Sequence, residues 1–243
     1  MIQGLITLNN PNYAPEGWHG TLLVIAVAAF CIIFNTFLAK RLPMVEGLVL
    51  IVHILGFFAV LIPLWVLAPR ASASDVFTTF LNIGGWGTTG LAFFVGLLSP
   101  VYTLIGADSA VHMSEEINDA SAVLPKAIMW AAAVNGTLGW VMIITFAFTL
   151  GDLFTVLETP TGYPFIQVFY NATNSNAGTS IMVAIVIVNI TSACISTVAT
   201  ASRQTWSFAR DQGLPFSKVL SHVSIAAPCL FRVQGNISVT HWR

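Results

Sequence analysis

The stretch GWHGTLLVIAVAAFCIIFNTFLA, residues 17–39, contains no Asp, Glu, Lys or Arg. A helix that crosses a bilayer needs about 20 mostly apolar residues, so this run is long enough to span one. The chain of 243 residues is 56% hydrophobic and 8% charged. Soluble domains carry about 25% charged residues. The composition therefore indicates a membrane protein and excludes an ordinary soluble enzyme.

Four more uncharged runs follow, at residues 47–69, 76–107, 127–151 and 159–202. The first part of the last run, TPTGYPFIQVFYNATNSNAG, is crowded with turn residues, and we expect a loop there. The sequence thus predicts an all-α, polytopic membrane helix bundle, because in lipid a helix bonds all of its backbone polar groups internally. We place five transmembrane helices, at about residues 17–39, 47–69, 88–107, 127–151 and 178–202.

The positions of Lys and Arg predict the orientation of these spans. Cytoplasmic loops carry an excess of Lys and Arg, and the connection after the first span contains Lys40 and Arg41. The segment after the fifth span is also basic, whereas residues 152–177 contain no cation and are expected outside. The sequon that begins at Asn171 lies in this external segment, which predicts glycosylation there.

The third uncharged run contains a group of helix-breaking residues. The end of this run and the charged residues after it read GLAFFVGLLSPVYTLIGADSAVHMSEE over residues 90–116. Pro100 removes an intrahelical hydrogen bond and Gly106 lowers helix propensity by about 1 kcal/mol, so we expect the helix to open between them and just beyond. An opened turn would present its dipole ends to a carboxylate, an ammonium or a coupling cation. The alternative is that Pro100 only kinks a continuous helix.

Charged residues near this run have two interpretations each. Asp108 either faces an aqueous cavity or marks the cytoplasmic boundary. Glu115 or Glu116 either pairs with Arg203 or Arg210 as a cytoplasmic gate, or all four are solvated loop charges. His53 and His112 can titrate, but single histidines without an acidic partner are more often structural.

Three strings resemble the fungal choline and GABA permease branch of the amino acid–polyamine–organocation (APC) transporter superfamily. They are GADSAVHMSEEINDASAVLPKAI, PTGYPFIQVFYNAT and ASRQTWSFARDQGLP. The resemblance covers about residues 1–222, and it implies a fold of twelve spans in which two five-helix repeats are inverted. The five runs would correspond to family helices four to eight, and this chain would then hold only part of the inverted-repeat fold.

The resemblance also implies a function and site residues. It implies secondary-active transport of amino acids, GABA or choline-like amines by alternating access, with a coupling proton. Tyr102 occupies the aromatic gating position, and the unwound stretch that lines the substrate is Thr103, Leu104, Ile105 and Gly106. Asp108, which we add to the substrate-binding residues, occupies an acidic position of the cytoplasmic half together with Glu115 and Glu116.

The chain also departs from the family pattern. Residues 223–243 diverge and lack a further apolar span, and the first residues resemble the end of family helix three. We therefore expect a shortened form that does not transport by itself. The alternative is a membrane interaction protein that associates with a full-length permease.

Other classes of function have no support in the sequence. HExxH and GxSxG motifs are absent, so we expect no enzyme, and nothing predicts a metal or a cofactor. The scattered cations exclude nucleic acid as a partner. We expect a multi-pass protein in the lipid bilayer, at the plasma membrane rather than the vacuolar membrane.

Overall fold

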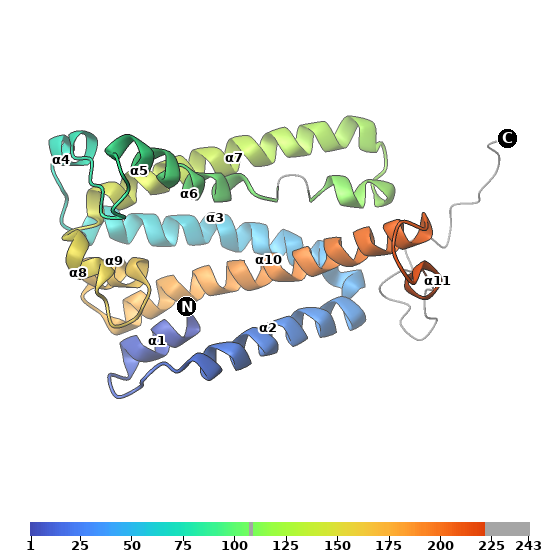
Figure 1. The fold of residues 1–243 in the computed structure, drawn as a ribbon, viewed down its shortest axis with the longest axis horizontal. Helices are drawn as coiled ribbons and strands as arrows, with labels where there is room; N and C mark the ends of the chain where they lie inside the picture. The colour runs from blue at the N-terminus through green and yellow to red at the C-terminus, as the bar shows by residue number, and fades with distance from the viewer. Residues whose placement is uncertain (107–108, 222–243) are drawn as a thin grey trace.

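The computed structural model describes residues 1–106 and 109–221, in which the secondary structure is helical and contains no strand. Four helices in this part of the chain are long and apolar enough to cross a membrane. They are α2 (Gly17–Phe37), α3 (Leu42–Leu67), α7 (Ala120–Thr149) and α10 (Asn176–Arg210). The four lie side by side in an elongated bundle (Figure 1). This confirms the predicted membrane helix bundle.

The third predicted span, residues 88–107, is not a single helix in the structure. The segment consists of α5 (Thr89–Gly96), α6 (Leu98–Val101) and the 3-10 turn η2 (Tyr102–Leu104). The Thr88 hydroxyl accepts a hydrogen bond from the Leu91 N–H and fixes the start of α5. The apolar helical part, Thr89–Val101, is shorter than a membrane-crossing helix.

The expected loop between the last two long helices contains two short ones, α8 (Leu153–Leu157) and α9 (Pro164–Thr173). The expectation of an irregular loop was therefore wrong over α9. Pro164 occupies the first turn, and Asn174 adopts a left-handed conformation directly after the last turn. Both are turn residues in a sequence reading, but Pro at a helix start and Asn at its end are also helix boundary signals.

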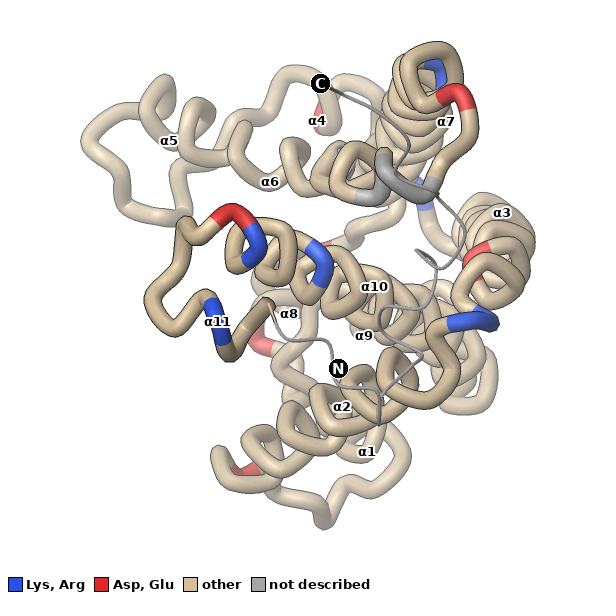
Figure 2. The backbone as a smooth tube through the Cα atoms, turned by 90° about the vertical axis from the view of Figure 1, so that its right-hand side faces the viewer, with Lys and Arg blue, Asp and Glu red and all other residues tan. Residues whose placement is uncertain are grey.

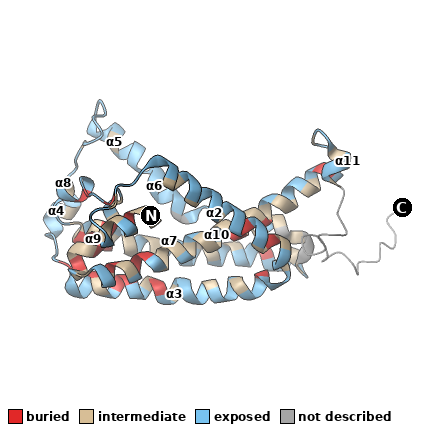
Figure 3. Ribbon diagram, turned by 90° about the horizontal axis from the view of Figure 1, so that it is seen from below, coloured by how far each residue is buried: buried red, intermediate tan, exposed pale blue. Residues whose placement is uncertain are grey.

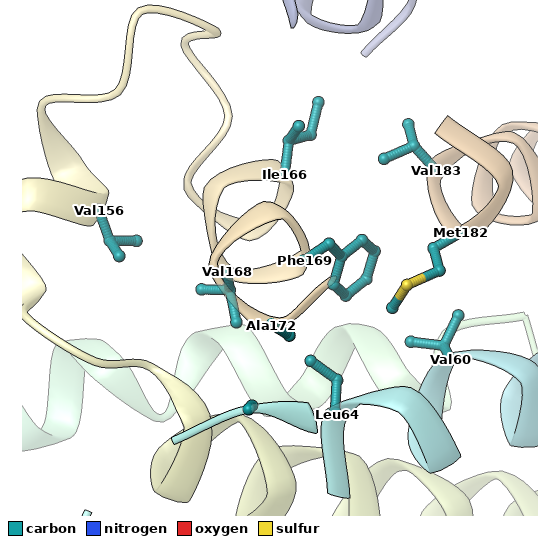
Figure 4. Close-up of a cluster of buried hydrophobic side chains, with 10 residues drawn as sticks. Val60, Leu64, Val156, Ile166, Val168, Phe169, Ala172, Met182 and Val183 are labelled. Carbon is teal, nitrogen blue, oxygen red and sulfur yellow. The ribbon is translucent and has the colours of Figure 1, made fainter. Parts of the chain in front are cut away.

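α9 carries the centre of the main hydrophobic core (Figure 4). Ile166 and Phe169 lie on its buried face and pack with Leu64 of α3 and with Met182 and Val183 of α10. Leu5 and Leu8 of α1 (Ile2–Asn9) cover this core from the N-terminal side. Burial is concentrated at this end of the bundle and along the contact between α2 and α10 (Figure 3).

The start of α8 is fixed by Asp152. Its carboxylate accepts hydrogen bonds from the hydroxyl and the backbone N–H of Thr155. Because these bonds favour the ionised form, they lower the pKa of Asp152 below its ordinary value.

The short helix α4 (Ala73–Thr78) lies at the same end of the bundle (Figure 1).

The opposite end of the bundle carries most of the described cations (Figure 2). It includes the 3-10 turn η1 (Ala39–Arg41), the 3-10 turn η3 (Val111–Glu116), the start of α7, the end of α10 and the short helix α11 (Ser217–Leu220). We expect this end to face the cytoplasm, because cytoplasmic segments are rich in Lys and Arg.

Candidate functional site

The helix break lies at Ile105 and Gly106. After the 3-10 turn η2, Ile105 is extended, with φ −64° and ψ 139°, and Gly106 has φ +89°. Glycine is suited to this position because a Cβ disfavours positive φ. The Gly106 carbonyl accepts hydrogen bonds from the backbone N–H of Ser109 at 3.0 Å and from its hydroxyl at 2.6 Å. The chain therefore leaves the helix where the sequence predicts.

The break opens onto a cavity of about 930 Å³. Tyr102, Ile105 and Gly106 form its wall on the side of the broken segment. α3 and α10 form most of the remaining wall, and Asn135 of α7 also contributes. The last turn of η2 therefore ends beside a space that is lined by two long helices.

The wall from α10 is a polar stripe on an apolar helix. All but one of its polar members recur at intervals of three or four residues, and Thr197 directly follows Ser196, so they share one broad helix face. They are Asn189, Ser192, Ser196, Thr197, Thr200 and Gln204. Our sequence reading missed this face, although the spacing of Ser, Thr and Asn within the span was a visible signal.

The wall from α3 contributes two titratable side chains, Glu46 and His53, which are two turns apart and share a face. The hydroxyl of Ser196 donates a hydrogen bond to the Glu46 carboxylate. Among the described residues that line the cavity there is no Lys or Arg. Glu46 therefore makes the cavity favourable for a cation.

The structure brings together only part of the predicted substrate-binding set. Tyr102, Ile105 and Gly106 line the cavity, whereas Leu104 is not among the lining residues. Leu104 lies toward α7. The Cδ2 atom of Leu104 is 3.8 Å from the place that a Cβ atom would occupy at Gly136 of α7. Asp108 and the side chain of Thr103 lie outside the described part of the structure.

The predicted cytoplasmic gate stays a prediction, since the side chains of Glu115 and Glu116 are not among those described. Arg203 and Arg210 both lie on the last turns of α10. The Nε atom of Arg210 is 3.6 Å from a carboxylate oxygen of Asp211. Near the predicted gate, the Gln204 amide and the His112 ring hydrogen-bond at 3.2 Å and join α10 to η3.

The sequon residue Asn171 lies within α9. Its side chain is half-buried, and its side-chain oxygen Oδ1 accepts a hydrogen bond from the Gln167 side-chain amide at 2.8 Å. Glycosylation acceptors are typical of surface loops. Glycosylation at Asn171 stays a prediction.

A second cavity, of about 460 Å³, adjoins the first. His53, Asn189 and Ile190 line both. The rest of its wall is apolar, and Phe57 and Phe146 are among the side chains that form it. The polar cavity is thus continued toward the main core by an aromatic one.

A model of the amino acid permease family matches residues 1–229. The chain belongs to this family. The permease-family match includes the helix break and both cavity-lining helices, α3 and α10. It confirms the resemblance inferred from the three strings.

Several curated fungal proteins are similar to this family member. It is 30% identical to a choline transporter of Saccharomyces cerevisiae over 92% of this chain and 40% of the relative. It is 32% identical to a protein of Macrophomina phaseolina named as an amino acid/polyamine transporter, over 91% of this chain and 49% of the relative. A swainsonine transporter of Arthroderma benhamiae is 28% identical over 90% of this chain and 43% of the relative.

The chain spans less than half the length of these relatives. No solved structure matches it.

Proposed function

We propose that this chain forms part of a secondary-active transporter for small amines or amino acids, which works by alternating access around Gly106. The observation that carries the proposal is the opening of the η2 helix end onto the polar cavity. Ile105 has left the helix and lines the cavity with an extended backbone, so its carbonyl group can accept a hydrogen bond from a bound ligand. Irregular backbone at membrane depth is tolerated where it lines such a cavity.

The chemistry of the cavity favours a substrate that carries an ammonium group. Glu46 contributes a carboxylate to the cavity wall, and the described lining residues include no Lys or Arg. Tyr102 is 70% exposed and offers a ring face for a cation–π contact. The hydroxyls and amides of α10 can bond the remaining polar groups of the substrate. The names of the relatives, which include choline and amino acid/polyamine, agree with this class.

The proposal includes a coupling proton. Three titratable side chains line the described cavity wall together with Tyr102: Glu46, His53 and His112. Ionisable groups that face a cavity of a membrane protein commonly mark ion or proton pathways. We propose that a proton taken up at one of these groups accompanies the substrate.

Uptake of labelled choline, GABA and amino acids tests the function. The chain, joined to the flanking segments that longer relatives contain, is expressed in cells that lack their own carriers, where we expect it at the plasma membrane. We expect saturable uptake of at least one compound, and Asn189→Leu should reduce it because a cavity-lining amide is lost. Thr205→Val, also on α10 but not among the cavity residues, is the matched control. Uptake that neither variant changes would contradict a substrate site in this cavity.

We also propose that these 243 residues alone do not transport. The cavity is partly open in the described structure, so its described lining residues do not fully enclose a substrate or exclude water. The same uptake assay applied to the short and the extended chain separates the cases. Equal uptake by the short chain would overturn this part of the proposal.

The alternative function, association with a full-length permease, is favoured by the open cavity between α3 and α10, which another helix-bearing protein could cover. Co-purification of the short chain with an intact relative would support it. Failure of the two proteins to co-purify from the same membrane would remove it.

A further inference from the structure

The end of α10 and the short helix α11 form a cationic cavity that the transport proposal does not use. The cavity has a volume of about 590 Å³, and Arg210 and Lys218 both line it. The hydroxyls of Ser217 and Ser221 and the amide of Gln212 are further polar groups in its wall. Two cations with hydroxyl and amide groups around one cavity are a recognition surface for a phosphate.

The backbone between α10 and α11 brings Arg210 and Lys218 to the same cavity. After α10 ends, Gln212 adopts a left-handed conformation with φ +60°. Its N–H donates to the Ala209 carbonyl at 3.1 Å, and the Gly213 N–H donates to the Phe208 carbonyl at 2.9 Å. This is the Schellman pattern of helix termination. It turns the chain so that α11 contacts α10 and Lys218 faces the same cavity as Arg210.

The length of α10 places this cavity at the surface of the membrane. With 35 residues, the helix is about 52 Å long at 1.5 Å per residue, whereas the hydrocarbon core is about 30 Å thick. Arg203 is the first charged residue after the apolar run, so the last turns of α10 extend into the headgroup layer. This is also the cation-rich end of the bundle, which we expect at the cytoplasmic leaflet, where anionic lipids are concentrated (Figure 2).

Exposed apolar side chains border the cationic cavity. Phe216 is 81% exposed and Val219 is 73% exposed, and both contribute to the cavity wall. A site for a free phosphate gains nothing from such side chains. A lipid with a charged headgroup and apolar chains contacts both parts of the surface at once.

We propose that this cavity, lined by Arg210 and Lys218, binds the phosphate-bearing headgroup of an anionic lipid, while Phe216 and Val219 contact the lipid chains. The Asp211 carboxylate, 3.6 Å from Arg210, is itself exposed to solvent and screens part of that charge. The site binds lipid whether or not the neighbouring permease cavity transports, so the two proposals fail independently.

Native mass spectrometry of the purified full chain in detergent tests the proposal. The probes are short-chain phosphatidylinositol 4-phosphate, phosphatidylserine and phosphatidylcholine, together with inositol phosphate as the free headgroup. We expect both anionic lipids to bind more tightly than phosphatidylcholine and the free headgroup. Equal affinity for phosphatidylcholine would overturn the site. Equal affinity for the free headgroup would overturn the lipid as the ligand and indicate that the site binds a soluble anion.

Variants locate the binding on the cavity. Arg210→Gln with Lys218→Gln should weaken binding of the anionic lipids by roughly tenfold or more, since each cation near a membrane surface contributes about 1 kcal/mol. Arg210→Lys with Lys218→Arg should retain binding. Arg70→Gln with Lys126→Gln removes the same charge away from the cavity and should leave the affinity unchanged. A loss of equal size in this control pair would overturn the assignment.

Phe216→Ser separates the two halves of the site. It should weaken binding of the anionic lipids and leave binding of the free headgroup unchanged. An unchanged lipid affinity in this variant would contradict the contact with the lipid chains. The thermal unfolding midpoint of each variant confirms that it is folded.

Discussion

At the scale of single residues, a buried amide ties two apolar helices together. Asn35 of α2 is 3% exposed. Its Nδ2 atom donates to the Cys31 carbonyl at 2.9 Å and to the Ile195 carbonyl of α10 at 3.0 Å. A polar side chain inside a membrane protein is stable where it finds such partners. Asn35 therefore fixes the position of α2 against α10.

Asn35→Ala should lower the free energy of unfolding by about 1 kcal/mol, because an interhelical hydrogen bond is lost in a dry contact. Reversible unfolding in mixed micelles, followed by circular dichroism, measures the change. Thr36→Ala is the matched control, since the exposed Thr36 hydroxyl bonds only within α2, to the Ile32 carbonyl at 2.8 Å. A similar loss in both variants would show that the tie to α10 adds no stability.

Gly106 holds a backbone conformation that a residue with a Cβ atom would strain. Gly106→Ala adds a Cβ at φ +89°, where nothing lies within 4 Å, so the substitution introduces backbone strain without a clash. The strain of about 1–2 kcal/mol should lower uptake by roughly five- to thirtyfold. Gly96→Ala, also in open space but in a helical conformation, is the control in the same uptake assay. Normal uptake by the Gly106 variant would contradict a requirement for the break.

At the scale of elements, the cavity depends on how closely α3 and α10 cross. Gly56 of α3 is buried at the crossing, and a Cβ there would lie 2.5 Å from the Cγ2 atom of Ile185. Small residues at helix contacts allow backbones to approach closely in membranes. Beyond this contact, the two helices line the polar cavity with Glu46, His53 and the polar stripe of α10.

Gly56→Ala should destabilise the bundle by about 1–3 kcal/mol, because the added methyl group forces the two helices apart. Gly47→Ala on the same helix has nothing within 4 Å of its Cβ and should be neutral or slightly stabilising. The thermal unfolding midpoint in detergent measures both. Adding Ile185→Ala to the Gly56 variant should restore part of the loss, and absence of any rescue would contradict this account of the crossing.

At the scale of the whole molecule, packing is uneven along the bundle. The main core joins α3, α8, α9 and α10 at the end that carries Val156 and Ile166 (Figure 3). Many apolar side chains on the outer surfaces of α2 and α3 are exposed, as expected for helices that contact lipid or other helices. The break segment lies apart from the main core, beside the open polar cavity.

This unevenness predicts the pattern of amide hydrogen exchange in lipid nanodiscs. Amides of α9 should exchange much more slowly than those of Tyr102 to Gly106, because local opening is easiest where few apolar contacts and regular hydrogen bonds hold the backbone. Exchange followed by mass spectrometry gives both regions in one experiment. Equal protection of the two regions would show that the break is as firmly held as the core.

The sequence by itself determined the class of the fold and the place of the break. A long uncharged run in lipid is stable as a helix, because a helix bonds its backbone polar groups internally. Pro100 and Gly106 mark the place where the helix of the third run ends. It did not determine α9, because Pro164 and Asn174 read equally as turn residues and as helix boundaries. Only the tertiary structure decided which polar residues of α3 and α10 share the cavity with Tyr102. Sequence spacing assigns a residue to a helix face, but which faces meet depends on helix crossings such as that at Gly56.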